Sequence, residues 1–445
     1  MRGQTIGAKL MLIKGNIPHS EPTVSIGLVL PGDSQTELQL FISNLNAFKF
    51  ILDGTPAEIT ETDLTIRVQN NELAVNGHQV SEMWCIPLFA EKDDYIQLNP
   101  IRAGRGFHWE KNIKIKVLGD VRISLKDGQL FVVNQVTLEK YIMCVATSEM
   151  SANCPPALLE AQTIAARSWL LAAEEQKHKD LGLDACNDDC CQRYQGVNNL
   201  TESALAAGQS THGRVLIYYH QICDARYSKS CGGITENNEN VWSEEPKPYL
   251  RSIQDSEGIP PPMLHNSIGR KSWFLSNPAC FCSPDYVPED ELAAYLGNVD
   301  EKGNYFRWSV SLTQQELLES VNHKTGSDFE YIHSLIPLQR GSSGRIIRLS
   351  IDGTINNQNS TIAVETEYEI RHVLHPDFLF SSAFIIQTDF GDGSHPTHFH
   401  LKGAGWGHGV GLCQIGALGM ALAGKSSGDI LNHYFRSTEL LKLYD

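Results

Sequence analysis

The sequence contains no long apolar run and no block of basic residues. Its hydrophobic stretches are all shorter than the roughly 20 residues of a membrane-spanning helix, so we expect no transmembrane segment. Lys and Arg number 36 against 52 Asp and Glu, which gives a formal net charge of −16. A field of this sign repels phosphate backbones and argues against a nucleic-acid partner. Neither a fixed-period repeat nor a low-complexity tract is present, which excludes repeat folds.

The first residues also lack a secretory signal. The segment MRGQTIGAKLMLIKGN is basic, but its apolar stretch from Leu10 to Ile13 is too short for the hydrophobic part of a signal peptide. No small-residue cleavage site follows it. The sequence as given therefore predicts no export signal, and the compartment stays open because a processed exported protein would also lack one.

Cysteine is frequent, but its distribution does not indicate a disulfide framework. Eleven cysteines are an odd number spread over 445 residues, which fits reduced thiols plus one metal or redox cluster better. The densest group is Cys186, Cys190 and Cys191, with His178 upstream. Thiolate and imidazole are the ligands of tetrahedral zinc. Because the spacing is irregular, we expect at most three of these four side chains to be ligands; free thiols are the equal alternative.

The hydrophobic patterns predict an α+β fold, in which a mixed or antiparallel sheet packs against one long helix and is preceded by a β-rich domain. Short alternating and β-branched runs fill Thr23 to Val136. A Pro-Pro pair precedes the predicted helix from Pro156 to Gln176, and weaker helical patterns lie at 201–209, 289–297, 314–322 and from Ser427. We expect a β-rich domain at 1–136 and a second domain at 137–445, with an irregular insertion or subdomain at 253–335.

Glu149 is the first candidate for chemistry. It lies where the apolar segment YIMCVA ends, with Met143, Met150 and Trp169 available to wall it in. Desolvation at such a position raises a carboxyl pKa, which a general acid at neutral pH requires. The alternative is an exposed acid in a turn that leads into a helix.

Arg167 is the second candidate, and it lies inside the predicted helix. The small side chains of Ala165 and Ala166 would let a ligand approach the helix closely, and a guanidinium could then hold a carboxylate through two hydrogen bonds. The alternative is an internal salt bridge with Glu160 or Glu174.

A glycine-rich segment near the C-terminus, GAGWGHGVGLCQIGALGM, is the third candidate. Trp406, His408 and Gln414 lie among its glycines. Glycines allow positive φ and a close approach of the backbone to a bound group, and an indole face can stack on a sugar ring. The segment is no phosphate-binding loop, because no Lys-Ser or Lys-Thr follows at the required offset. The alternative is a tight loop that packs its glycines against a helix.

Taken together, these stretches resemble the stage II sporulation protein D (SpoIID/LytB) family. The resembling stretches follow the family's order: YIMCVATSEM with PPALLEAQTIAARSWLL, then CQRYQG, then SKSCGGITENNENVW with KPYLRS, and finally GAGWGHGVGLCQIGALGMALAG with ILNHYF. The β-rich domain and the region 253–335 are covered poorly or not at all. Cys231 and Cys413 stand where serine is common in the family, and a thiol can replace a hydroxyl sterically at either position.

The resemblance implies a SpoIID-like catalytic domain with lytic transglycosylase activity in the bacterial cell envelope. Its substrate would be peptide-stripped peptidoglycan glycan strands, cleaved at the MurNAc-GlcNAc bond to leave 1,6-anhydro-MurNAc ends. It assigns Glu149 as the catalytic acid and Arg167 as its catalytic-site partner. The implied substrate-binding residues are Tyr141, Gln162, Trp406, His408 and Gln414. No cofactor is required for this chemistry, although some members carry a structural zinc, for which His178, Cys186, Cys190 and Cys191 are the candidates here.

Two other function classes fit the same residues. A non-catalytic glycan-binding protein that enhances a cell-wall amidase would use the same groove. A zinc- or thiol-dependent enzyme, for instance with Cys413 beside His408, would instead lose activity on chelation or alkylation.

Overall fold

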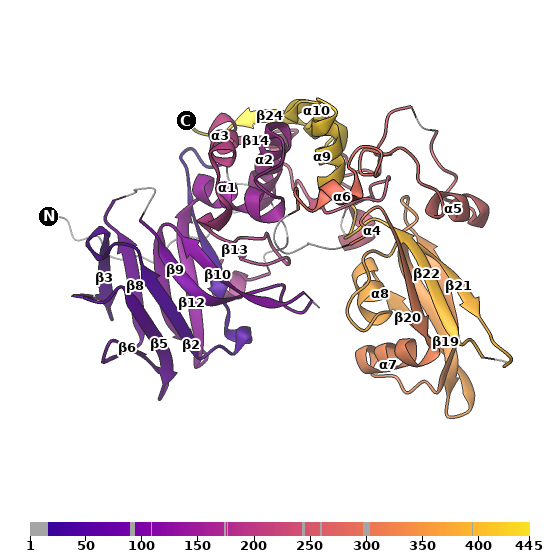
Figure 1. Ribbon diagram of the computed structural model, residues 1–445, viewed down its shortest axis with the longest axis horizontal. Coiled ribbons are helices and arrows are strands. Elements are labelled where there is room, and N and C mark those ends of the chain that lie inside the picture. Colours follow the sequence, from indigo (N-terminus) through magenta and orange to yellow (C-terminus); the bar gives the residue numbers. More distant parts are fainter. Residues whose placement is uncertain are drawn as a thin grey trace.

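The computed structural model describes residues 17–89, 94–107, 109–172, 175, 177–242, 245–258, 260–296, 303–393 and 395–445. The chain forms a β-rich N-terminal part, a central helical part and a C-terminal part of sheets and helices (Figure 1). The predicted α+β class is confirmed. The predicted absence of an export signal concerns residues 1–16, which lie outside the described residues.

The N-terminal part is a β-sandwich. Its strands are β1 (Thr23–Val29), β2 (Glu37–Ile42), β3 (Phe48–Leu52), β4 (Thr55–Ala57), β5 (Asp63–Gln69), β6 (Glu72–Val75), β7 (His78–Val80), β8 (Glu82–Pro87), β9 (Ile96–Ala103), β10 (Lys111–Val117), β11 (Asp120–Lys126), β12 (Gln129–Thr137) and β13 (Ala185–Cys186). The two sheets have the orders β13-β1-β12-β11-β8-β3-β4 and β10-β9-β2-β5-β6-β7. Leu38, Leu40 and Ile42 of β2 alternate into the shared core, because successive strand side chains point to opposite faces.

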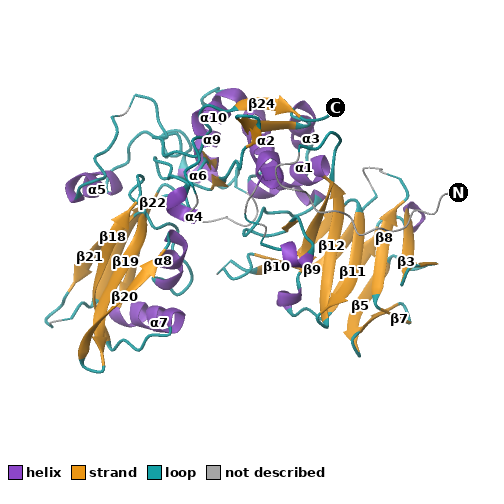
Figure 2. Cartoon of the chain, turned by 180° about the vertical axis from the view of Figure 1, so that it is seen from behind, coloured by secondary structure: helices purple, strands orange, loops and turns teal. Residues whose placement is uncertain are grey.

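In the central part, helices surround α2 (Pro156–Ala172). This helix begins at the second proline of the Pro-Pro pair, as the sequence predicts. The surrounding helices are α1 (Leu138–Glu149), α3 (Glu202–Ser210), α9 (Gln414–Leu422) and α10 (Ser427–Tyr434). They gather between the two strand-rich parts (Figure 2). Short strands complete the centre: β14 (Arg214–Tyr218) pairs with β15 (Gln221–Ile222) and β24 (Glu439–Lys442), and β16 (Tyr227–Ser228) pairs with β23 (Leu412–Cys413). Residues 173, 174 and 176 of the predicted helix lie outside the described residues.

The C-terminal part has its own apolar core. One sheet joins β17 (Arg307–Thr313), β22 (His398–Ala404) and β21 (Phe384–Asp389), and another joins β18 (Tyr331–Arg340), β19 (Ile346–Ile355) and β20 (Gln358–Glu365). Helices α7 (Gln314–Thr325) and α8 (Glu367–Val373) belong to the same part, whereas α4 (Glu239–Trp242), α5 (Ser267–Phe274) and α6 (Glu289–Leu292) lie in the long connection before it. A reciprocal capping box of Thr313 and Glu316 begins α7.

The domain boundaries inferred from sequence stay predictions. The boundary at residue 136 lies beside the junction of β12 and α1, although β13 from the later chain adds to the N-terminal sheet. The predicted end of the insertion, at Leu335, lies inside β18, and the part that contains this strand continues to Ala404. In the described part of the chain, every helix is too short or too polar to cross a membrane.

Arg167 takes part in a buried ion pair that holds the central part together. Its guanidinium is fully buried and donates from Nε and Nη2 to the Glu139 carboxylate, over 2.8 and 2.5 Å, and from Nη1 to the Arg214 carbonyl over 2.8 Å. The backbone N–H of Gly213 and the hydroxyl of Tyr444 also donate to Glu139. The prediction that Arg167 contacts a ligand is corrected. The alternative of an internal salt bridge holds, with Glu139 and not Glu160 as the partner, whereas Glu174 lies outside the described residues.

We expect Arg167→Leu to lower the free energy of unfolding by about 3–5 kcal/mol, because it leaves the Glu139 charge buried without its partner. The double variant Arg167→Leu with Glu139→Leu should lose less than the sum of the single changes. Arg67→Leu is the matched control, since its pair with Glu37 is about half exposed and such pairs contribute about 0–1 kcal/mol. Chemical denaturation measures wild type and the four variants, among them Glu139→Leu alone. An Arg167→Leu stability equal to that of the control would contradict the structural role.

Candidate active site

A cavity of about 540 Å³ lies where the three parts meet. The N-terminal part contributes Phe107 and Trp109, and the C-terminal part contributes Tyr368 and Phe378. The rings of Phe107 and Phe378 meet edge to face with centroids 5.2 Å apart, so the two outer parts touch at this point. The central part supplies further lining residues, among them Glu149, Trp169, Arg193, Arg226, Tyr227, Lys229, Trp242, Trp406, His408 and Gln414.

Glu149 is the last residue of α1, and its carboxyl group lies in the wall of this cavity. Only 8% of the residue is exposed. Oε1 accepts hydrogen bonds from the Arg193 backbone N–H at 3.1 Å and the Tyr227 hydroxyl at 3.2 Å. Oε2 accepts from Nε2 of Gln414 at 3.3 Å, and Nζ of Lys229 donates to the Glu149 backbone carbonyl at 2.7 Å. The three contacts to Oε1 and Oε2 fix the carboxyl group, and the Lys229 contact fixes the backbone beside it, while the carboxyl group stays part of the cavity wall.

Burial raises the pKa of Glu149 above its ordinary value, because water that would solvate the charged form is excluded. The positive charges of Arg193 and Lys229 and the Arg193 N–H act in the opposite direction, and the nearby charge of Asp189 adds to the increase. Desolvation is the largest of these effects. The carboxyl group therefore keeps its proton to a higher pH than an exposed glutamate, as the sequence predicted for a general acid.

The glycine-rich segment delivers Trp406, His408 and Gln414 to the cavity as predicted. Gly405 has φ of +78°, and a Cβ there would lie 2.7 Å from the Ser230 carbonyl, so this close approach requires glycine. Burial lowers the pKa of His408 well below its ordinary value and keeps the ring neutral. Its Nδ1 accepts the Val410 N–H at 3.0 Å, which leaves the ring proton on Nε2.

Tyr141 and Gln162 do not line the cavity, so the prediction that they contact substrate is corrected. Tyr141 is fully buried on α1 and packs its ring against Tyr194, with centroids 5.0 Å apart. Gln162 is fully buried on α2, and its Oε1 accepts from Nε2 of Gln414 at 3.4 Å. Gln162 therefore acts on Glu149 only through Gln414.

Several residues of the site were missed by reasoning from the sequence. Tyr227 and Lys229 contact Glu149 from the stretch that ends in Cys-Gly-Gly, and Arg193 contacts it from CQRYQG. The Arg226 guanidinium lies over the Trp242 ring, 3.6 Å from its centroid. Arg193, Lys229 and Trp242 lie within the stretches that resemble the SpoIID family, and this could have marked them as site residues. Their distance along the chain from Glu149 gave no indication that they lie near it.

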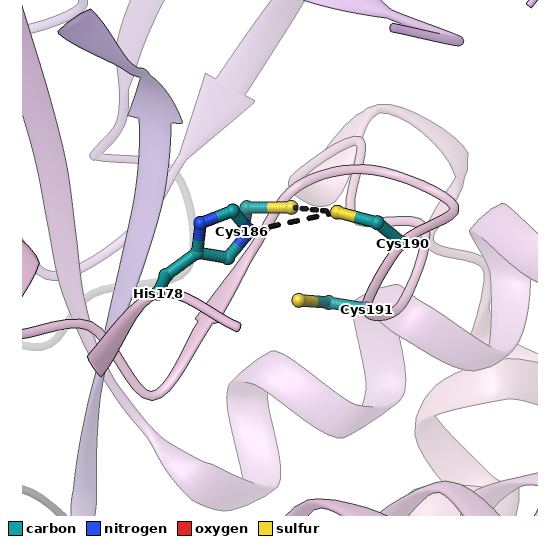
Figure 3. Close-up of side chains that lie close together, drawn as sticks. All are labelled: His178, Cys186, Cys190 and Cys191. Carbon is teal, nitrogen blue, oxygen red and sulfur yellow. Dashed lines mark hydrogen bonds between the residues drawn. The ribbon is translucent and has the colours of Figure 1, made fainter. Parts of the chain in front are cut away.

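His178, Cys186, Cys190 and Cys191 come together beside the cavity (Figure 3). Their ligand atoms all lie within 4.8 Å of one another; Cys190 Sγ is 3.2 Å from Cys186 Sγ and 3.5 Å from His178 Nε2. The sequence predicts at most three ligands among them, but the fold brings all four side chains together: Cys186 ends β13, Cys190 and Cys191 lie in the turn after it, and His178 comes from the segment before it. Three thiols and an imidazole are a donor set that fits tetrahedral zinc.

Two family models match the chain. The model described as stage II sporulation protein, SpoIID, matches residues 126–218, which include Glu149 and the His178/Cys186/Cys190/Cys191 cluster. The SpoIID resemblance is confirmed. A second model, described as a domain of unknown function, DUF8618, matches residues 236–411, which include Trp406 and His408.

Similar proteins agree with this result. An uncharacterized protein of Brachyspira hyodysenteriae is 26% identical over 328 residues, covering 74% of this chain and 73% of that protein. An amidase enhancer of Bacillus subtilis is 26% identical over 306 residues, covering 66% of this chain but 39% of that protein. A stage II sporulation protein D of Bacillus amyloliquefaciens is 22% identical over 328 residues, covering 69% of this chain and 75% of that protein. These matches support a role related to the cell wall.

The raised pKa of Glu149 predicts a pH-dependent gain in stability for Glu149→Gln. In the unfolded chain a glutamate ionises near pH 4.3, about its ordinary pKa. The folded protein binds more protons between that value and the raised one, so its free energy of unfolding falls as pH rises through this window. Glutamine has no proton to lose. The free energy of unfolding of Glu149→Gln minus that of wild type should therefore increase from about pH 4 upward. It should level off at a pH above the pKa of Glu149 in the folded protein.

Chemical denaturation across this pH range measures the difference. Glu160→Gln is the control, because it also removes a carboxylate but outside the cavity. Glu160 accepts hydrogen bonds from the hydroxyls of Ser210 and Ser427. A difference between Glu149→Gln and wild type that falls with pH would contradict the raised pKa.

Proposed function

We propose that the protein is a peptidoglycan lytic transglycosylase that cleaves peptide-stripped glycan strands at the MurNAc-GlcNAc bond. The burial of the Glu149 carboxyl group, which raises its pKa although the charges of Arg193 and Lys229 act in the opposite direction, is the observation that supports this most directly. Among the described residues, Glu149 forms no ion pair, whereas the other carboxylates that line the cavity do. Their pairs are Asp189 with Arg193, Glu175 with Lys177, and Glu367 with Arg371. A buried carboxyl group without a paired cation is the suitable proton donor.

In the proposed reaction Glu149 first donates its proton to the oxygen that leaves C1 of MurNAc. The bond between C1 and that oxygen breaks, and positive charge develops on the MurNAc ring. The Glu149 carboxylate then takes the proton of the same sugar's 6-hydroxyl, whose oxygen bonds to C1 and closes the 1,6-anhydro ring. One carboxyl group suffices, because an intramolecular hydroxyl replaces the water or enzyme nucleophile that a second carboxylate serves in hydrolytic enzymes.

Aromatic and cationic side chains of the cavity suit a glycan strand. Trp109, Trp169, Trp242 and Trp406 line it, and the apolar faces of sugar rings pack against aromatic rings. Arg226 and the other cations of the wall can hold the lactyl carboxylates of muramic acid. In this proposal these cations hold the substrate carboxylate, which is the role that the sequence suggested for Arg167.

A non-catalytic role is the second candidate, because one similar protein is an amidase enhancer. In that case the same cavity binds glycan and the protein enhances a cell-wall amidase as its partner. Either role acts on peptidoglycan, so both place the protein in the bacterial cell envelope.

Products of wild type and Glu149→Gln on peptide-free glycan strands, analysed by mass spectrometry, separate these candidates. We expect 1,6-anhydro-MurNAc ends from wild type and at least a hundredfold fewer from the variant, since removing a general acid costs about 10²–10⁴ in rate. Glu160→Gln should cleave like wild type. Glycan binding without cleavage by wild type, together with enhancement of an amidase that Glu149→Gln retains, would overturn the enzyme proposal in favour of the amidase-enhancing role.

We also propose that His178, Cys186, Cys190 and Cys191 hold a structural zinc ion. Bound there, zinc would fix the turn that leads to Arg193 and so support the wall of the cavity. The triple variant Cys186→Ser, Cys190→Ser and Cys191→Ser should contain one zinc per chain less than wild type, by elemental analysis of the purified folded protein. Cys85→Ala, a change in the sandwich core, is the control and should keep the wild-type content. Equal zinc in the triple variant and wild type would refute this site.

A further inference from the structure

A second cluster of ligand side chains lies in the core of the central part. It consists of Cys231, Asp255, Cys282 and Cys413, whose ligand atoms all lie within 4.8 Å of one another. Cys231 follows β16, Cys413 ends β23, and Asp255 and Cys282 come from the long connection that contains α5 and α6. We propose that these four side chains bind one Zn²⁺ ion in a closed, structural site.

The spacing of the sulfur atoms fits a single tetrahedral ion. A Zn–S bond of about 2.3 Å places two thiolates of a tetrahedron about 3.8 Å apart. Sγ of Cys231 lies 3.7 Å from Sγ of Cys282 and 3.4 Å from Oδ2 of Asp255. Three thiolates select zinc over the hard ions calcium and magnesium, which prefer oxygen ligands in larger number.

The burial of Asp255 indicates a positive partner. The residue is fully buried, and in the described part of the chain no lysine or arginine pairs with it. Its Oδ1 accepts from the Tyr434 hydroxyl at 2.7 Å and lies 3.4 Å from Nε2 of His433. Its Oδ2 faces the thiols. A buried carboxylate is costly unless it is paired or coordinates a metal, and an ion among the thiols would supply the missing charge.

Backbone groups around the cluster are arranged as they are around bound thiolates. The N–H groups of Cys231 and Gly416 point at Sγ of Cys413, at 3.1 and 3.3 Å, and the N–H of Gly233 points at Sγ of Cys231, at 3.4 Å. Such outer hydrogen bonds orient metal ligands and lower the energy of their negative charge. A Cβ on Gly416 would lie 2.4 Å from Oδ2 of Asp255, so helix α9 approaches the carboxylate at a distance that only glycine permits.

The proposed ion would be structural and not catalytic. All four ligands are at least 97% buried, and four protein ligands leave no open coordination position. The site is nevertheless next to the cavity, because Gln414 follows Cys413 and Lys229 lies two residues before Cys231. An ion here would fix two of the side chains that contact Glu149. The inference goes beyond the proposed function and does not depend on it.

Zinc content per chain tests the site, with Cys282→Ser compared with Cys280→Ser. Both cysteines are buried and only one residue apart, but Cys280 is not part of the cluster. We expect folded Cys282→Ser to contain one zinc per chain less than wild type, and Cys280→Ser to match wild type. Equal zinc in Cys282→Ser and Cys280→Ser would overturn the proposal. Because metal is counted and not activity, this outcome is independent of whether Glu149 cleaves glycan.

Native mass spectrometry gives a second measurement that needs no change in the new cluster. The protein examined is the triple variant Cys186→Ser, Cys190→Ser and Cys191→Ser, which lacks the thiols of the first cluster. One bound zinc in that protein supports the proposal, and a Co²⁺-exchanged sample should show the sulfur-to-cobalt absorption of a tetrahedral thiolate site. A metal-free chain, or one lighter by the two hydrogens of a Cys231–Cys282 disulfide, would overturn it.

Discussion

The buried pair of Glu139 and Arg167 is the interaction on which the placement of the site depends. Glu139 lies in the first turn of α1 and Glu149 ends the same helix, about 15 Å further along its axis. A helix is stiff over this length, so fixing its start against α2 also fixes the position of its end. Arg167 is thus outside the cavity lining and yet helps to fix where the Glu149 carboxyl group lies. It illustrates how a polar residue in a characteristic motif can be a positioning element and not a ligand contact.

The contacts of Glu149 have a common origin, since three of them come from residues that neighbour a thiol cluster. Arg193 lies two residues after Cys191, Lys229 two residues before Cys231, and Gln414 directly after Cys413. Lys229 and Gln414 directly follow the short paired strands β16 and β23, whereas Arg193 lies in a segment without helix or strand. The segments that contain Arg193, Lys229 and Gln414 converge at the two thiol clusters, whether or not these hold metal. The rigidity that a preorganised acid requires is therefore supplied by this short strand pair together with the side chains around the loops.

Much of the fold could be predicted from the sequence because its signals are local. The Pro-Pro pair before α2, the alternating pattern of β2 and the apolar end of α1 at Glu149 are each readable within a few residues. The partner of Arg167 was not readable, because Glu139 lies 28 residues earlier and meets it only after two helices pack. The four residues around Cys231 span 183 positions of the chain, from 231 to 413, and long-range packing alone brings them together. The irregular spacing of His178 and the three cysteines after it predicts at most three ligands, yet the folded loops bring all four side chains together.

The wall of the cavity gathers cations although the chain as a whole is acidic. Among the described residues that line it, Arg105, Lys177, Arg193, Arg226, Lys229 and Arg371 stand beside four acidic residues, one of which is Glu149, and carboxylates outside the lining pair with Arg105 and Arg226. The chain as a whole carries −16, so a dense polyanion is repelled at long range, where fields add. The proposed substrate, a sugar strand with a carboxylate on every second residue, has a low charge density and would meet the local cations only after it entered. The overall acidity of the chain is therefore compatible with the proposed glycan substrate and unfavourable for nucleic acid.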